Sequence, residues 1–515
     1  MASRTTTAPP VEDGGLLISE EAPLLSGEAT TAVRDKWRVV AGAFVVLFLI
    51  ELAVGISTPA WNALLEEGLC AEAYPETASF LAAASDDNPL CKDRAVQGTL
   101  ALYRGWAYAL DCLPTILLAL PYGSLSDRWG RKPIAILSII GLTLGMVWYE
   151  IVFYFLLPMW TFALGFVFNL IGGGSAVGMS MIYTMLADVL DVEEMTPVLF
   201  RFHSVFLVAE LVANPLGGLL VGQGPWLALV VGNVLMILVM GSICIFPETL
   251  AVRLWRDERA GRVPRPQLTP LGADDGDDGD ELKKPTTQAA LGGAWAQLTQ
   301  VWEFLVGNRR LVVLMLPLIF VTLGKYIQEM LLQYARKRFG WSWSKAAYFL
   351  TLKSASFIVM LTVILPALSS FCLGTLGMSR LSTDMWLSRW SGVVLVVADL
   401  AIALSSSPAL FGAGLVLLSG GSGLVPLLRS LLNAQVEPHH VGILNTLLGF
   451  LDTLGVMIGA PVFSQSLRKG IELGGPWIGL PFLAGAVISC FAAGMLWLFS
   501  IPPQVEGSAG QGGQA

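Results

Sequence analysis

The stretch of sequence that decides the fold runs from Gly123 to Pro133 and reads Gly-Ser-Leu-Ser-Asp-Arg-Trp-Gly-Arg-Lys-Pro. It lies between two long apolar runs, 99–121 and 134–157. Its glycine and charged positions are Gly123, Asp127, Arg128, Gly130, Arg131 and Lys132. Glycines permit a tight turn, and clustered Lys and Arg hold a loop on the cytoplasmic side of a membrane. The acid can pair with an arginine or lie at a helix N-terminus, where negative charge is favoured. We therefore expect a turn between two membrane-spanning helices.

The composition of the whole chain is typical of an integral membrane protein. Of its 515 residues, 54% are hydrophobic and 14% are charged, against about 25% charged in an ordinary soluble domain. The mean hydropathy is +0.66. The net charge of −8 comes largely from acids between 274 and 281, so no nucleic-acid partner is expected. With only three histidines, we expect no enzyme, no metal site and no cofactor.

Membrane spans follow from the apolar runs, because a bilayer core of about 30 Å is crossed by about 20 helical residues. Twelve such runs are present, at 38–59, 99–121, 134–157, 159–186, 200–222, 226–246, 311–333, 344–368, 389–405, 408–431, 441–463 and 477–501. With the N-terminus in the cytoplasm, 20 of the 31 Lys and Arg fall in cytoplasmic segments and 8 in external ones. We expect both termini to be cytoplasmic.

The chain divides into two sets of six helices. The segment between them is rich in Pro, Gly and acids and cannot bury enough apolar surface to fold, which predicts a disordered cytoplasmic linker. The expected parts are a disordered tail at 1–36, a bundle at 37–246, the linker at 247–310, a bundle at 311–501 and a disordered tail at 502–515. The predicted fold is all-α: twelve transmembrane helices in two pseudo-symmetric six-helix bundles.

The stretch from Gly123 to Pro133 resembles the signature loop of the major facilitator superfamily, nearly residue for residue. Pro247-Glu-Thr-Leu250, after the sixth span, is similar to the ending that this family uses there. The resemblance extends over about 37–501 and is of a eukaryotic, fungal type. It implies a transporter like the family's multidrug and metabolite exporters or its proton symporters. It also implies that the signature turn acts as a conformational latch.

Three weaker matches depart from the family pattern. The loop between helices 8 and 9 keeps only Asp384 and Arg389 of a second signature copy. In helix 4, Asn169 stands where the family's proton-antiport branch has an arginine. In helix 5, one residue is missing between Pro215 and the glycine pair of the antiporter motif. These departures argue against a standard proton-antiport drug exporter. The glycine-rich runs of helices 4 and 10 are interpreted as packing surfaces.

Charged residues inside the spans are the candidates for the substrate and proton cavity, since an isolated charge at mid-bilayer costs on the order of 3 kcal/mol. On the helices that line the family's cavity, these are Glu51, Arg104, Asp111, Glu210, Lys325, Glu329, Lys353 and Asp452. Glu150 and Asp399 fall on helices outside the cavity and are expected to have packing roles.

Spacing leaves several pairings of these residues open. Lys325 and Glu329 can pair, being four residues apart on one helix. Glu51, Glu210 and Asp452 have no cation on their own helix within the membrane. They either pair with Arg104, Lys325 or Lys353 across the cavity, or they hold protons, because an apolar environment favours the neutral carboxyl.

Cys70 and Cys91 both lie in the first external loop, where oxidising conditions favour a disulfide. The other four cysteines are expected to be free thiols. Near the N-terminus, Glu20 to Leu25 resembles an acidic dileucine sorting signal, but the plasma membrane is favoured over the vacuolar membrane.

The function expected from these features is secondary active transport of a small organic molecule by rocker-switch alternating access. We expect transport to be coupled to protons. We also expect the protein to be a monomer embedded in the lipid bilayer. Two alternatives stay open: a transport-inactive sensor or receptor on the same fold, and a nutrient uptake symporter rather than an exporter.

Overall fold

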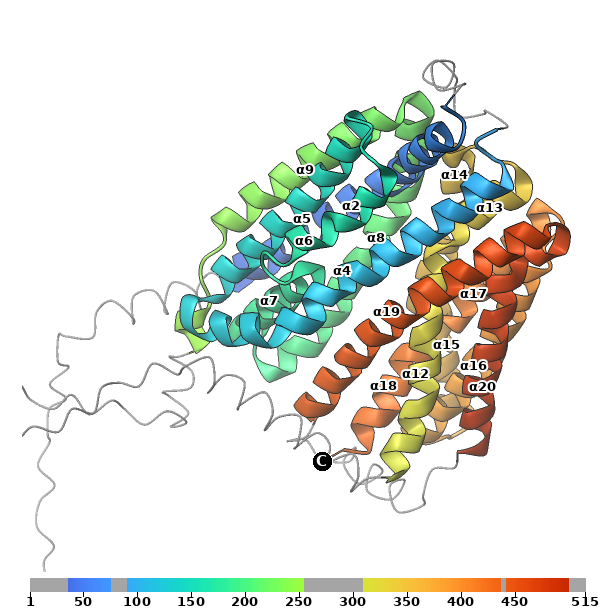
Figure 1. The fold of residues 1–515 in the computed structure, drawn as a ribbon. Helices are drawn as coiled ribbons and strands as arrows, with labels where there is room; N and C mark the ends of the chain where they lie inside the picture. Colours follow the sequence, from blue (N-terminus) through green and yellow to red (C-terminus); the bar gives the residue numbers. More distant parts are fainter. Residues whose placement is uncertain (1–35, 76–89, 254–308, 437–440, 500–515) are drawn as a thin grey trace, which may run out of the picture.

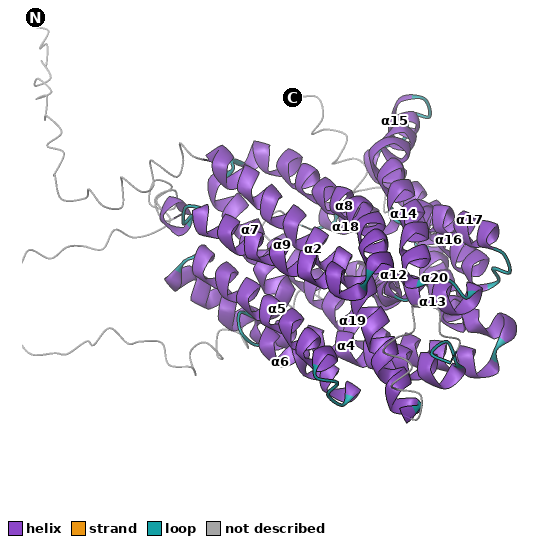
Figure 2. Cartoon of the chain, turned by 90° about the horizontal axis from the view of Figure 1, so that it is seen from above, coloured by secondary structure: helices purple, strands orange, loops and turns teal. Residues whose placement is uncertain are grey.

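The structure is a computed structural model that describes residues 36–75, 90–253, 309–436 and 441–499. The dileucine-like Glu20–Leu25, most of the predicted linker, His439, His440 and both predicted tails lie outside the described residues. Within the described residues every regular element is helical (Figure 2). Twelve helical stretches there are long and apolar enough to cross a membrane. The chain is therefore a multi-pass, all-α membrane protein.

The first six spans are built from α2 to α9. Their bounds are α2 Lys36–Ala73, α4 Arg94–Trp129, α5 Arg131–Tyr154, α6 Phe166–Asn169, α7 Gly174–Val189, α8 Val192–Gln223 and α9 Pro225–Ile245. Helix starts follow local sequence signals: Asp93 accepts the backbone N–H of Ala95 at the start of α4, and Pro225 opens α9 directly after Gly224.

The last six spans are built from α12 to α20. Their bounds are α12 Arg309–Glu329, α13 Leu331–Phe339, α14 Trp343–Val359, α15 Leu365–Gly374, α16 Arg380–Ala403, α17 Pro408–Gly421, α18 Leu424–Ala434, α19 Val441–Leu473 and α20 Leu480–Leu498. A π-helical turn over Met360–Ile364 joins α14 to α15 within one span. Serine side chains accept backbone N–H groups at the starts of α14, α16 and α17.

The two sets of helices form two bundles that meet along one side and diverge toward one end (Figure 1). We call the end that carries Asp127 to Lys132 the motif end, and the opposite end, which carries Cys70 and Cys91, the disulfide end. Between the bundles, α4 packs on α19 and α8 packs on α14. Gly105 lets α4 approach closely, because a Cβ there would lie 2.8 Å from the backbone oxygen of Ala460. These close contacts lie in the half of the molecule toward the disulfide end.

Two sequence predictions about helix boundaries are wrong. The expected turn from Gly123 to Pro133 shrinks to one residue, Gly130, because α4 continues to Trp129 and α5 starts at Arg131. Gly123 therefore lies inside a helix. Likewise α16 starts at Arg380, so the predicted loop residues Asp384 and Arg389 are helical.

The fourth span is broken, although its apolar run is continuous. Gly172, Gly173 and Gly174 all have φ between 78° and 85°, a left-handed conformation that glycine adopts without a Cβ penalty. At Gly172 a Cβ would also meet the backbone of Ser138 in α5. The glycine run therefore serves as a break and a close-packing site, beyond the packing surface expected from sequence.

Candidate functional site

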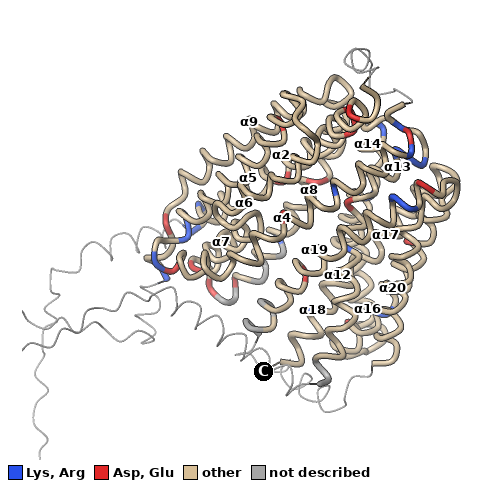
Figure 3. Tube along the Cα trace, viewed as in Figure 1, with Lys and Arg blue, Asp and Glu red and all other residues tan. Residues whose placement is uncertain are grey.

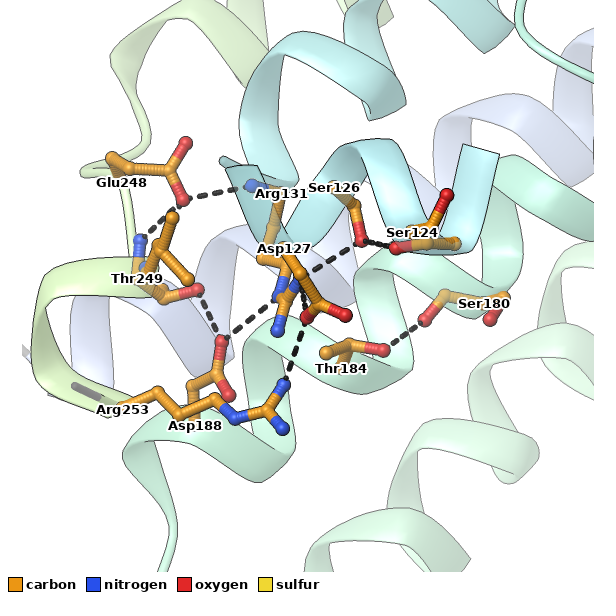
Figure 4. Close-up of polar contacts among 12 residues, drawn as sticks. Ser124, Ser126, Asp127, Arg131, Ser180, Thr184, Asp188, Glu248, Thr249 and Arg253 are labelled. Carbon is orange, nitrogen blue, oxygen red and sulfur yellow. Dashed lines mark hydrogen bonds and ion pairs between the residues drawn. The ribbon is translucent and has the colours of Figure 1, made fainter. Parts of the chain in front are cut away.

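Arg131 forms the centre of an ionic network at the motif end (Figure 4). Its guanidinium lies 2.7 Å from Asp127 one turn earlier and 3.5 Å from Asp188 at the end of α7. It also donates to the Ser126 hydroxyl at 2.8 Å, while the Thr249 hydroxyl donates to Asp188 at 3.0 Å. Arg131 is only 1% exposed, so this charge is fully desolvated and depends on these partners.

Glu248 closes the network from the other side by capping α5. Its carboxylate accepts the backbone N–H groups of Arg131 and Lys132 at 2.9 and 3.0 Å. A carboxylate at a helix N-terminus satisfies donors that have no partner within the helix. Gly130 makes the approach possible, because its φ is +105° and a Cβ there would lie 2.7 Å from the Glu248 carboxyl carbon. The Pro-Glu-Thr segment thus fastens the sixth span to the start of the third.

The remaining signature residues differ in their contacts. The Lys132 ammonium donates to the carbonyls of Cys244 and Phe246 at 2.7 Å each, which caps the end of α9. The Arg253 guanidinium lies 3.1 Å from Asp127. Arg128 is exposed and makes no ion pair with any described residue. All of these contacts join helices of the first bundle to one another, and the latch role of this turn stays a prediction.

Two polar contacts join the bundles at mid-span, both between α8 and α14. The Lys353 ammonium lies 3.1 Å from the Glu210 carboxylate. One residue after Lys353, the Ser354 hydroxyl accepts a hydrogen bond from the Asn214 amide at 2.9 Å. Glu210 thus has a cation from the other bundle, which is one of the two arrangements that its sequence left open.

Asp452 lies between two cations of the second bundle. The Lys325 ammonium is 2.9 Å away and the Arg429 guanidinium 2.5 Å away. The expected local pair of Lys325 with Glu329 does not form, because the Lys325 side chain is held by Asp452 of α19. Arg429 is absent from the charges predicted inside the spans, because it stands near the end of its apolar run, next to a predicted cytoplasmic loop. It lies inside α18.

Arg104 and Asp111, both on α4, have separate partners. The Arg104 guanidinium donates to the backbone carbonyl of Glu329 at 3.1 Å, a third contact between the bundles. Asp111 accepts from the Tyr149 hydroxyl at 3.3 Å and from the Asn169 amide at 3.2 Å. Asn169, in the fourth span, therefore binds the carboxyl group of Asp111 in the second span.

Glu51, like the side chain of Glu329, forms no ion pair and no hydrogen bond with any described residue. It lies at a niche of about 210 Å³ between α2, α5 and α7. The niche is otherwise lined by apolar groups and two serines: Ile50, Ala135, Ser138, Ile139, Leu142, Ser175, Ala176, Gly178, Met179 and Ile182.

Glu150 and Asp399, the two acids expected to have packing roles, each bind a polar side chain of their own bundle. Glu150 accepts two hydrogen bonds from the Asn233 amide, at 2.7 and 2.8 Å, within the first bundle. Asp399 is buried between α16 and α20, where the Ser489 hydroxyl donates to it at 3.1 Å.

A buried ion pair closes the disulfide end. The Arg336 guanidinium of α13 lies 2.6 Å from the Glu66 carboxylate of α2, and both residues are 2% exposed. The Trp343 indole N–H donates to the same carboxylate at 2.5 Å, and the Arg336 guanidinium stacks over the Trp343 ring. Sequence reasoning missed these residues, because they follow the long apolar runs and read as loop positions.

The disulfide supports this closure. Cys70 and Cys91 are bonded to each other, and the Gln97 amide donates to both the Cys91 carbonyl and the Glu66 carboxylate. Nearby, the Lys337 ammonium donates to the carbonyl of Lys92, and burial lowers the pKa of Lys337. In contrast, no hydrogen bond or ion pair between described residues joins the bundles toward the motif end from Glu210. Figure 3 shows the positions of charged residues along the chain, which gather at the ends of the helices, with a few between them.

Comparisons with known proteins agree with this architecture. The family model described as Major Facilitator Superfamily matches residues 101–460. The efflux pump atnC of Emericella nidulans is 28% identical over 448 residues, covering 86% of this chain and 84% of its own. The efflux pump ustT of Aspergillus flavus is 27% identical over 465 residues, covering 88% and 87%.

Solved structures share the fold at lower identity. A D-xylose–proton symporter has a TM-score of 0.59 at 12% identity, covering 91% of this chain and 99% of its own. The human organic anion transporter MFSD10 has a TM-score of 0.53 at 19% identity, covering 90% and 99%. Groups of three or more metal-binding side chains do not occur among the described residues.

Proposed function

The chain belongs to the major facilitator superfamily and is a membrane-embedded transporter of that family, and we propose that it exports a small organic molecule by proton-coupled alternating access. The curated relatives described above are efflux pumps, which favours export over uptake. A transport-inactive sensor would not need a cavity with charged groups at the contact between two bundles, and no observation favours that role.

The observation that carries the proposal is the uneven contact between the two bundles. Every hydrogen bond and ion pair between them, among described residues, lies at mid-span or toward the disulfide end. The bundles diverge toward the motif end (Figure 1). The distribution of Lys and Arg along the chain supports a cytoplasmic motif end. With the motif end in the cytoplasm, these contacts support a state that is closed to the outside and open to the cytoplasm.

Switching to the outward-open state requires the Glu66–Arg336 pair to separate. The two charges would leave a site in which they are fully desolvated and enter water, which offsets the loss of the pair. A rocking motion of this kind needs no new chemistry, only a change in which ends of the bundles touch.

Proton coupling is assigned to Glu51, Glu210 and Asp452, at least one of which carries the proton. Glu210 has the strongest geometric reason, because its partner Lys353 belongs to the other bundle. Protonation of Glu210 would cancel that attraction and change the contact between the bundles. Glu51 is the second candidate, because a carboxylate in a mostly apolar niche without a cation favours a bound proton.

The test is flux through the purified full-length chain in proteoliposomes. A panel of organic compounds is measured with and without an imposed proton gradient. Glu51→Gln, Glu210→Gln and Asp452→Asn are then compared for exchange and for accumulation against a gradient. Glu150→Gln is the control, since that half-buried carboxyl is bound by Asn233 within the first bundle.

We expect at least one of the three cavity variants to keep exchange and lose uphill accumulation, while the Glu150 variant keeps both. Uphill accumulation by all three would rule out the coupling assignment. Transport of the panel only toward the motif end would instead favour the uptake symporter.

A further inference from the structure

A cavity of about 400 Å³ lies on the first bundle at the disulfide end. It is lined by α2, by the end of α5, by the start of α9 and by the 3-10 helix Met159–Gly165. Its volume is within the range of about 300–1,000 Å³ that is usual for small-ligand sites. Among the described residues that line it, Glu67 is the one that carries a charge, and the others are apolar or aromatic residues and a glycine. The single carboxylate therefore favours a ligand with a positive charge.

The cavity lies where the apolar spans give way to the polar end of the molecule. Tyr154 and Trp226 stand at the ends of the apolar runs 134–157 and 226–246, and Glu67 lies beyond the run 38–59 of α2. The side chain of Tyr154 is 71% exposed and that of Trp226 is 40% exposed. Exposed Trp and Tyr at the ends of spans lie at the level of the lipid headgroups. A headgroup of the leaflet at the disulfide end therefore has direct access to this cavity.

Two aromatic rings meet at a right angle at this cavity. The centroids of Tyr154 and Trp226 are 6.1 Å apart, and their planes cross at 88°. The face of an aromatic ring attracts a cation, and aromatic cages bind quaternary ammonium groups in this way. On α2, Leu64 and Glu67 are three residues apart and share one helix face, so an apolar group and a carboxylate line the same wall. A trimethylammonium group matches this set, because its methyl groups pack on apolar surface and the carboxylate balances its charge.

Contacts within the first bundle hold the inner wall of the cavity in place. The Glu72 carboxylate accepts the backbone N–H of Met159 at 2.7 Å. The Met159 sulfur packs on α2 at Gly68, where a Cβ would lie 2.4 Å from it. Phe153 is buried and stacks on Phe162 with ring centroids 5.7 Å apart. The wall is therefore formed before any ligand binds, as is usual for small-ligand sites.

Leu156 lines the same cavity in a backbone conformation that disfavours a side chain. Its φ is 49°, the one positive φ at a non-glycine position among the described residues. The backbone N–H of Leu157 donates to the carbonyl of Val152 at 3.0 Å, which closes α5 with a left-handed residue where glycine is the usual choice. The Leu156 side chain is 73% exposed, so packing within the protein does not account for it. Strained residues of this kind cluster at ligand sites.

We propose that this cavity binds the choline headgroup of a phosphatidylcholine molecule from the leaflet at the disulfide end. The trimethylammonium group lies against Tyr154 and Trp226 with Glu67 as its counter-ion, and Leu156 forms an apolar wall beside it. An anionic headgroup is repelled by the carboxylate. The primary ammonium of phosphatidylethanolamine carries three N–H donors, which one carboxylate and two rings leave largely unmatched. Lipid binding at this site is independent of the transport function proposed above.

The test is a lipid titration of the purified, delipidated full-length chain in detergent, read by native mass spectrometry. Three lipids with the same dioleoyl chains carry the phosphatidylcholine, phosphatidylethanolamine and phosphatidylglycerol headgroups. We expect phosphatidylcholine to bind about tenfold more tightly than the other two, which is the size of effect that a partly desolvated cation–π site supplies. Tetramethylammonium is titrated as a soluble competitor, which separates a lipid headgroup from a free cation.

Variants assign this preference to the cavity. Trp226→Ala and Glu67→Gln should each remove the preference for phosphatidylcholine, and Trp226→Phe should keep most of it, because a phenyl ring still presents a face to the cation. The matched controls are Trp160→Ala and Glu472→Gln. Trp160 is exposed at the same end without being among the lining residues, and Glu472 belongs to the second bundle. Both controls should bind the three lipids as the wild type does.

Leu156→Gly tests the wall without removing a ring or a charge. It should keep the melting temperature, because glycine adopts the left-handed conformation without strain, and it should weaken phosphatidylcholine binding. Equal affinity for the three lipids, or a preference that survives both Trp226→Ala and Glu67→Gln, would overturn the proposal. Tetramethylammonium that binds as tightly as the lipid would overturn it in favour of a site for soluble cations. Since none of these measurements uses flux, an absence of transport would contradict only the proposed function.

Discussion

The motif ends of the two bundles perform the same packing task with different chemistry. In the first bundle, Arg131 of α5 pairs with Asp188 of α7. In the second, the equivalent helices α16 and α18 are joined by Asp384, which accepts a hydrogen bond from the Ser430 hydroxyl at 2.7 Å. The first bundle thus uses an ion pair at this place, whereas the second bundle uses a hydrogen bond from a neutral hydroxyl to a carboxylate.

Both bundles have a cation that caps the C-terminal end of a helix. Lys132 caps the end of α9, and Arg389 caps the end of α20 by donating to the carbonyls of Leu496 and Phe499 at 3.0 and 2.7 Å. A cation at a helix C-terminus satisfies carbonyls that have no partner within the helix and is favoured by the helix dipole. The cap is therefore the common requirement of six-helix packing, and the buried ionic network is an addition of the first bundle.

The buried ionic network of the first bundle is therefore a candidate for a functional role rather than a packing role. Desolvating several charges stabilises a fold little compared with apolar packing. The second bundle forms without such a network, so packing alone does not require it. A role of the first bundle's network in the change of conformation stays a prediction, which the following comparisons test.

The largest expected effect is that of Arg131→Ala. It removes the cation that pairs with the buried Asp188, and breaking a buried pair costs about 3–5 kcal/mol. The melting temperature of the purified protein should fall strongly while membrane insertion persists, as measured by fluorescence-detected size exclusion after heating. A melting temperature within error of the wild type would contradict the assigned role of the network.

Arg389→Ala should have the next largest effect on stability. It removes two hydrogen bonds to carbonyls and the stacking on Trp497, and because Arg389 is only half-buried, each hydrogen bond contributes about 0.5–1.5 kcal/mol. The same heating assay should place this variant between Arg131→Ala and the wild type. Transport per folded molecule should be unchanged, in contrast to the first bundle. A larger loss of stability than that of Arg131→Ala would reverse the comparison between the bundles.

Substitutions at the two glycines of the signature stretch are expected to change stability in opposite directions. Gly130→Ala forces a side chain into a conformation with φ +105° and into the Glu248 carboxylate, so we expect a loss of about 1–3 kcal/mol. Gly123→Ala lies inside α4 with open space around it and should stabilise that helix by about 0.5–1 kcal/mol. Melting curves of the two single variants measure both. Opposite signs are expected, and equal losses would be inconsistent with the structure.

Asp127→Asn should change stability least, because the side chain is 58% exposed and exposed ion pairs contribute about 0–1 kcal/mol. Transport should nevertheless slow strongly if the turn latches one conformation. Initial rates in proteoliposomes, normalised to folded protein, measure this. A well-folded Asp127 variant that transports at the wild-type rate would contradict the hypothesis that this turn acts as a conformational latch.

The sequence was sufficient for the elements that depend on local composition. Apolar runs of about 20 residues predict spans regardless of their neighbours, because lipid requires every backbone hydrogen bond to be satisfied within a helix. Boundaries were less predictable: α4 continues through Asp127 because polar residues do not stop a helix, and only Gly130 does so.

The cavity shows the limit of sequence reasoning more clearly. Charges inside apolar runs, such as Glu210 and Lys353, can be found by inspection, since membrane insertion makes them rare. Their partners cannot, because a pair 143 residues apart depends on how two bundles dock. Spacing along one helix suggested Lys325 with Glu329, whereas packing gave Lys325 to Asp452.

The sequence by itself therefore determined the number of spans, the family, the signature residues and the acids without a cation on their own helix. Only the tertiary structure decided that Glu51 has no cationic partner among the described residues, that Arg429 pairs with Asp452 and that Glu66 pairs with Arg336 at the disulfide end. The physical reason is the range of the interactions involved. Hydrophobic length and helix propensity are properties of a continuous segment, whereas an ion pair between bundles is set by the packing of helices far apart in the chain.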